Sequence, residues 1–170
     1  MNSVASQLTR DHQELHALLR GLAQDARAPL PGMLQSTWTT FENRLLRHME
    51  TEEQCLLPLI EGNDPKEVIR IRTEHARIRN VLSELGIAIE LHTVREANIN
   101  ELIVLLETHA KHENTALYRL AEDRASSDDR IAQLIKHGVA AAAAAVSGKL
   151  AERKTSSRRK AASGVHKRHP

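Results

Sequence analysis

The sequence contains few aromatic residues, few glycines and prolines, and one cysteine. Only Trp38, Phe41 and Tyr118 are aromatic, and the seven glycines and five prolines are a small share of the 170 residues. β-Sandwiches and barrels need many turns and strands rich in β-branched and aromatic residues, so this composition argues against them. The single cysteine, Cys55, excludes an internal disulfide framework and a cysteine-rich zinc or iron–sulfur site.

Long apolar runs are absent as well. No stretch of ~18 apolar residues occurs, which argues against a membrane span. Residues 1–10 lack the apolar segment of a secretory signal. We therefore expect a cytoplasmic protein without a membrane partner, and 170 residues are enough to bury a sizeable core.

The net charge of +2 arises from one end of the chain. Residues 153–170 contain seven Lys or Arg and no acidic residue. The whole chain has 24 basic and 22 acidic residues, so residues 1–152 have 17 basic against 22 acidic residues, a net charge of −5. Because residues 153–170 have little apolar surface, we expect a disordered basic tail. Such a tail could make weak, non-specific contacts with nucleic acid.

Four amphipathic helices with well-marked ends account for the body of the chain. The first is predicted from Ser6 to Ala26, and the second follows Pro31 and reaches about Ile60. An Asp64-Pro65 start with Glu67 at the third position predicts the third helix. A capping-box pattern, Thr93-Val94-Arg95-Glu96, predicts the start of the fourth. Long helices joined by short links predict an all-α, up-down-up-down four-helix bundle.

The chain is expected to continue beyond this bundle. A cap at Ser126-Ser127 and an alanine-rich segment predict a C-terminal helix over residues 126–152. The expected organisation is a bundle over residues 1–125, this helix, and the tail over 153–170. The C-terminal helix would lie on the bundle or on a second copy of the chain, which would make a homodimer.

The positions of the ten histidines are the main indication of function, because four of them fall in the apolar stripes of the four helices. The pattern His-x-x-x-Glu occurs at His48 and Glu52 and again at His109 and Glu113. A spacing of four puts both side chains on one helix face. The first and third helices each place one histidine in the apolar stripe, His12 and His75 respectively.

Six ionisable side chains are therefore expected to meet at one level of the core. A carboxylate without a partner is costly to bury, so buried carboxylates that bind a metal are favoured over buried carboxylates that bind nothing. Imidazole and carboxylate ligands without thiolate suit iron, manganese or zinc. The ferritin-like alternative needs Glu-x-x-His, and no Glu in this chain has a His three residues later. The expected metal ligands are His12, His48, Glu52, His75, His109 and Glu113.

These motifs resemble those of a known family. Asp11-His12, His48-x-x-x-Glu52-Glu53, Glu74-His75 and His109-x-x-x-Glu113 are similar, in order and spacing, to the motifs of the hemerythrin-like (HHE cation-binding) family. The resemblance implies two non-haem iron ions inside a four-helix bundle. It implies that His12 and His48 bind one iron and that His75 and His109 bind the other. Glu52 and Glu113 would bridge the ions, together with an oxo or hydroxo group.

Two departures from the oxygen-carrying members bear on function. Those proteins have a further histidine one turn after the position of His75, where this chain has Arg79. Their last motif has Asp five residues after His, where this chain has Glu at four. The Arg79 side chain would turn to solvent or pair with a carboxylate such as Glu113 or a bound anion. One iron would then keep an open position, which favours sensing, redox or nitric-oxide chemistry over oxygen carriage.

Three classes of function remain open from the sequence. The leading one is a di-iron protein that binds or senses oxygen or nitric oxide, or handles iron. The second is a di-iron enzyme that turns over peroxide or nitric oxide, or repairs iron–sulfur centres. The third is a metal-free helical interaction protein. Whether the protein is an enzyme is left open.

Four further residues are weighed as neighbours of the expected centre. His16 is a spare ligand or a residue of the helix surface. His112 and Glu53 flank the motif residues and support the ligands or face solvent. Cys55, one turn after Glu52, is expected on the inward face.

Overall fold

The computed structural model describes residues 4–27, 33–127, 133 and 137. Within these residues every regular element is a helix and no strand occurs, which confirms the all-α fold. None of the described helices is long and apolar enough to cross a membrane. The elements are α1 (Val4–Arg27), α2 (Met33–Thr51), the π-helical turn η1 (Glu52–Leu56), α3 (Leu57–Ile60), α4 (Pro65–Glu90), α5 (Glu96–Thr115) and α6 (Leu117–Ser127).

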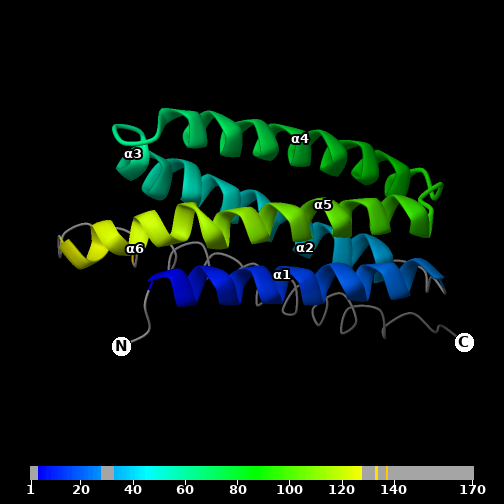
Figure 1. The fold of residues 1–170 in the computed structure, drawn as a ribbon. Helices are drawn as coiled ribbons and strands as arrows, with labels where there is room; N and C mark the ends of the chain where they lie inside the picture. The colour runs from blue at the N-terminus through cyan, green and yellow to red at the C-terminus, as the bar shows by residue number, and fades with distance from the viewer. Residues whose placement is uncertain (1–3, 28–32, 128–132, 134–136, 138–170) are drawn as a thin grey trace, which may run out of the picture.

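These elements form four long rods that run up and down in turn (Figure 1). The second rod is α2 continued by η1 and α3, and the fourth is α5 continued by α6. The first rod, α1, packs against α2 and α5, and α4 packs against the same two helices. The result is the expected four-helix bundle, in which α1 and α4 occupy one diagonal and α2 and α5 the other. The expected C-terminal helix over 126–152 lies almost wholly outside the described residues, and the tail over 153–170 lies entirely outside them.

The links between the rods follow the sequence signals at one end of the bundle. The Asp64 side chain accepts a hydrogen bond from the Glu67 backbone N–H (3.1 Å), and Pro65 occupies the first helical turn of α4. Both features satisfy or remove N–H groups that a helix start leaves without partners. The predicted start of the third helix is therefore confirmed.

At the opposite end the expected Thr93–Glu96 capping box is replaced by one that lies two residues later, at Arg95 and Asn98. The N-cap of α5 is Arg95, and its backbone N–H donates to the Asn98 side chain (3.3 Å). The Thr93 hydroxyl instead donates to the Ala88 carbonyl (3.3 Å), which belongs to the end of α4. His92 has a positive φ of 57°, a conformation that ends helices. Thr93 therefore serves the end of one helix rather than the start of the next.

The core consists of two apolar clusters with a polar layer between them. The larger cluster includes Trp38 and Phe41, and the smaller includes Leu8 and Tyr118. Each long rod passes from one cluster to the other and contributes one or two polar side chains in between. On α4, for example, Ile71 belongs to the smaller cluster, His75 to the polar layer and Ile78 to the larger cluster.

The turn η1 changes which residues face the core after Glu52. A π-helical turn contains one more residue than an α-helical turn, so the residues that follow are shifted in phase. Leu56, Leu57 and Ile60 are buried, whereas Cys55 and Leu59 are only partly buried. The expectation that Cys55 lies on the inward face is therefore wrong, because it assumed a regular helix through this turn.

Candidate metal centre

The six expected ligands meet in the polar layer between the two apolar clusters. Each is nearly or fully buried, with exposed fractions from 0% for Glu52, His75 and Glu113 to 7% for His12. They form two overlapping groups, within each of which one ligand atom per residue lies within 4.8 Å of the others. The two groups are His12, His48, Glu52 and Glu113, and Glu52, His75, His109 and Glu113. Both carboxylates therefore belong to both groups.

The first group joins α1 and α2 to α5. The Nε2 atoms of His12 and His48 lie 2.8 Å apart. Glu113 Oε2 lies 3.2 Å from the Nε2 of His12, and Glu52 Oε1 lies 3.2 Å from the Nε2 of His48. Two imidazole nitrogens and two carboxylate oxygens thus face a common centre.

The second group joins α4 and α5 to η1. The Nε2 atom of His75 lies 3.4 Å from Glu52 Oε2 and 3.3 Å from Glu113 Oε1. The Nε2 atom of His109 lies 3.1 Å from the same Glu113 oxygen. All four histidines therefore present Nε2 to the carboxylates, and their Nδ1 atoms point away from the centre.

Several atoms at this centre are left without hydrogen bonds. Glu52 Oε2, Glu113 Oε2 and His109 Nε2 are buried and have no hydrogen-bond partner. The contacts of Glu113 with His12 and His109, and of Glu52 with His75, are within ion-pair distance but are not hydrogen bonds. Leaving a buried polar atom unpaired costs roughly 1–3 kcal/mol. A cation would accept lone pairs from all of these atoms at once, so the residues fit a metal.

Both carboxylates are held in the ionised form that a metal needs. Burial and the Glu113 charge act to raise the pKa of Glu52, but His48 and His75 lower it below its usual value. Burial likewise opposes ionisation of Glu113, yet the adjacent imidazoles of His109, His12 and His75 lower its pKa well below the usual value. Negative charge at the centre is therefore stabilised by the surrounding imidazoles.

Three of the four histidines are oriented by a carboxylate at their outer nitrogen. A carboxylate that accepts from Nδ1–H fixes the tautomer, leaves the lone pair on Nε2 and raises the basicity of the ligand. The pairs are His48 with Asp11 (2.7 Å), His75 with Glu53 (2.8 Å) and His109 with Glu74 (2.9 Å). Sequence reasoning left Asp11 and Glu74 without a role, although both immediately precede a ligand position.

Each of the two carboxylates behind His48 and His75 is held by an arginine. Arg44 donates to Asp11 through Nε (3.0 Å) and Nη2 (2.5 Å). Burial acts to raise the pKa of Asp11, but His48 and Arg44 lower it to about 2. Arg79 donates to both oxygens of Glu53 at 2.8 and 3.0 Å. The carboxylate that pairs with Arg79 is thus Glu53 and not Glu113.

His12 differs from the other three histidines. Its Nδ1 is buried and has no hydrogen-bond partner. Its ring stacks on Tyr118, with ring centroids 5.5 Å apart and planes at 23°. The Tyr118 hydroxyl lies 3.2 Å from His12 Nε2 and donates a hydrogen bond to Glu52. Burial raises the pKa of Tyr118 well above its usual value, and the charges of Glu52 and Glu113 add to this. No motif in the sequence indicated that Tyr118 lies at this centre.

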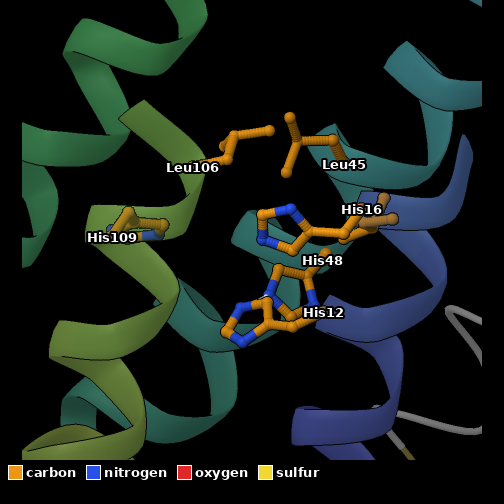
Figure 2. A pocket seen from close by; sticks show the side chains of 7 residues that line it. His12, His16, Leu45, His48, Leu106 and His109 are labelled. Atoms are coloured by element: carbon orange, nitrogen blue, oxygen red, sulfur yellow. Dashed lines mark hydrogen bonds between the residues drawn. The ribbon is translucent and has the colours of Figure 1, made fainter. Parts of the chain in front are cut away.

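A small cavity lies beside the centre. It is lined by His12, His48 and His109 from the two groups, by His16, and by Leu15, Leu45 and Leu106. Figure 2 shows the side chains of Leu45 and Leu106 extending toward each other beside the imidazoles of His12, His16 and His48, with His109 on the neighbouring α5. Its volume of about 10 Å³ leaves room for about one water molecule. His16, one turn after His12, is partly buried and belongs to the lining rather than to the helix surface.

The remaining flanking residue, His112, is a neighbour of the second group. Its Nδ1 lies 3.1 Å from both oxygens of Glu74, which also accepts from His109. Its Nε2 lies 2.6 Å from Glu67. His112 therefore contacts the carboxylate behind His109 rather than the centre itself, as expected for a supporting residue.

The chain was compared with known families, curated proteins and solved structures. Residues 3–121 match the family model described as the Hemerythrin HHE cation binding domain. No curated protein and no solved structure matches. The matched range contains all six residues of the two groups and covers most of the chain.

Proposed function

The chain belongs to the Hemerythrin HHE cation binding domain family, and from this premise we propose that it holds two non-haem iron ions and binds oxygen or nitric oxide. Membership in a cation-binding family and the two His/Glu groups support binding of metal cations. The identity of the metal as iron, the number of ions and the small ligand are the proposal.

The observation that carries the proposal is the sharing of two buried carboxylates by two groups of histidines. His12 and His48 would hold one ion, and His75 and His109 the other. Glu52 and Glu113 would bridge them, because each has oxygens near histidines of both groups. Bound iron would supply electron transfer and an open coordination position. The protein's own residues keep the ligands ionised, oriented and away from bulk water.

The cavity supports a small ligand rather than a large substrate. It adjoins His12 and His48 of the first group and His109 of the second. Its other walls are three leucines and His16, so it offers an apolar space with one imidazole outside the two groups. A volume near that of one water suits a diatomic molecule far better than an organic substrate.

Metal analysis of the purified chain tests the proposal first. We expect two irons per chain, one for each group of ligands, after expression in iron-replete cells or anaerobic reconstitution with iron(II). A chain that holds well under one iron and refuses reconstitution would contradict the iron centre. Stopped-flow spectra of the loaded protein with oxygen, nitric oxide and peroxide then decide the second part. Stable adducts support binding or sensing, whereas repeated turnover of peroxide or nitric oxide supports an enzyme.

A further inference from the structure

Tyr118 is the only tyrosine in the chain, and its hydroxyl lies inside the first group of metal ligands. The residue is 1% exposed. Its oxygen is 3.2 Å from the Nε2 atom of His12 and donates a hydrogen bond to the Oε1 atom of Glu52. These two atoms belong to the group in which the ligand atoms converge. The phenol oxygen therefore lies as close to ligand atoms of His12 and Glu52 as the ligand atoms of that group lie to one another.

A break in the fourth rod puts the phenol there. In a continuous α-helix, Tyr118 would be rotated by about 140° from Glu113, because five residues turn the helix through about 500°. Helix α5 instead ends at Thr115, and α6 begins at Leu117 after Ala116, which has φ −113° and ψ −70°. As a result the two consecutive side chains Leu117 and Tyr118 are both buried. Glu113 and Tyr118 thus reach the same layer.

The first group has one carboxylate fewer at the outer nitrogens of its histidines than the second group has. Both histidines of the second group have a carboxylate at Nδ1, Glu53 for His75 and Glu74 for His109. In the first group only His48 has one, and the Nδ1 atom of His12 has no partner. An imidazole without such a partner is a poorer donor to a metal. The phenol of Tyr118 is the remaining oxygen that could compensate at this ion.

We propose that Tyr118 is an additional oxygen ligand of the ion held by His12 and His48 when that ion is iron(III). The inference rests on the proposed iron centre. On binding, the phenol O–H bond breaks, the oxygen forms a bond to iron(III), and the proton is released to solvent. No electron is transferred in this step. Iron(III) is a hard cation that prefers anionic oxygen ligands, whereas the less charged iron(II) leaves the phenol hydrogen-bonded to Glu52.

Spectroscopy can detect this ligand directly because the chain has one tyrosine. The full chain is loaded anaerobically with iron(II), oxidised, and examined by visible absorption and resonance Raman spectroscopy. We expect a visible phenolate-to-iron(III) charge-transfer band, and phenolate ring vibrations enhanced within that band. Reduction to iron(II) should abolish both signals. They cannot come from any other residue of the chain.

The Tyr118→Phe variant removes the oxygen and keeps the ring that stacks on His12. We expect it to lose the visible band and the phenolate vibrations completely while it keeps its iron. Phe41→Leu is the matched control, since Phe41 is an equally buried aromatic residue of the larger apolar cluster. This control should keep both signals.

The outcomes separate the inference from the proposed function. Iron bound to the wild-type protein without phenolate vibrations overturns the inference and leaves the iron centre intact. A visible band of unchanged intensity in Tyr118→Phe overturns it as well. A chain that binds no iron contradicts the proposed function itself. If Tyr118→Phe does not fold, the resonance Raman spectrum of the wild-type protein decides alone.

Discussion

Replacing Glu53 by glutamine tests whether the carboxylates behind the histidines contribute to metal binding. Glu53 accepts from the Nδ1 atom of His75 at 2.8 Å and takes two hydrogen bonds from Arg79 at 2.8 and 3.0 Å. The variant Glu53→Gln keeps the size of the side chain and removes its charge. It therefore weakens the partner that fixes the His75 tautomer, and it leaves the Arg79 guanidinium without its counter-charge.

The expected loss falls on the ion bound by His75 and His109. Removing such a partner typically lowers metal affinity about 10–100-fold, or about 1.4–2.7 kcal/mol. The His12–His48 ion should keep its affinity, because its outer carboxylate is Asp11. Titration of the metal-free protein with iron(II) against a competing chelator should then show one weakened site and one unchanged site.

The matched control is Glu50→Gln, which makes the same chemical change on the same rod. Glu50 is exposed and accepts a hydrogen bond only from Gln54 among the contacts in the described residues (3.1 Å). We expect this variant to bind both ions as the wild type does. Equal affinities for Glu53→Gln and Glu50→Gln would refute the argument that the outer carboxylate tunes the ligand.

Three further outcomes are expected. Glu52→Ala or Glu113→Ala should lose more iron by metal analysis than His16→Ala, because each of the two carboxylates belongs to both groups; equal losses would argue against bridging. In the metal-free protein, burial opposes protonation of His75, but the neighbouring carboxylates of Glu113 and Glu52 raise its pKa to about 9. A raised folded-state pKa stabilises the fold below the unfolded pKa, so the free energy of unfolding from denaturant titrations should fall between pH ~7 and pH ~10. Metal replaces that proton, so the loaded protein should lack the decline, and a flat profile for the metal-free protein would contradict the assignment. Deleting residues 153–170 should leave iron content and the circular-dichroism helicity unchanged and remove any salt-sensitive nucleic-acid binding, and binding that survives the deletion would indicate another surface.

The fold was predictable wherever the helices are regular. On α4 the predicted stripe of apolar residues and His75 is buried at every position. This follows from an unbroken α-helix of 26 residues, in which the 3.6-residue period holds from end to end. On the second rod the same reasoning failed after Glu52. No residue pattern in the sequence indicates that η1 has one more residue per turn than an α-helix. Cys55 was therefore predicted to face the core, whereas the structure buries Leu57 there and leaves Cys55 only partly buried.

The candidate site was predictable to the extent that it depends on spacing within one helix. The two His-x-x-x-Glu pairs were found because four residues make about one turn. The position of Tyr118 at the centre was not predicted, because it depends on the helix break at Ala116. No feature of the sequence predicts that break. The partner of Arg79 was missed for a related reason, since the turn η1 brings Glu53 against α4. Pairs of charged side chains from different helices could be identified only from the three-dimensional structure.

The position of the two shared carboxylates follows from the arrangement of the bundle. Helices α2 and α5 lie on one diagonal, and each packs against both α1 and α4. A carboxylate from either rod can therefore reach a histidine of its own rod and one from a neighbour. Glu113 on α5 lies near His109 of its own helix, near His12 of α1 and near His75 of α4.

Glu52 reaches across the bundle in the same way, with the help of the π-helical turn. Its two oxygens lie near His48 of α2 and His75 of α4. The next residue, Glu53, contacts the other ring nitrogen of His75. Two consecutive residues of η1 thus contact both nitrogens of one imidazole, and a wider turn keeps consecutive side chains closer to one face than an α-helix does. Without that turn one of the two carboxylates would point away from α4, so η1 is the local feature that couples the shared ligand to the partner that orients His75.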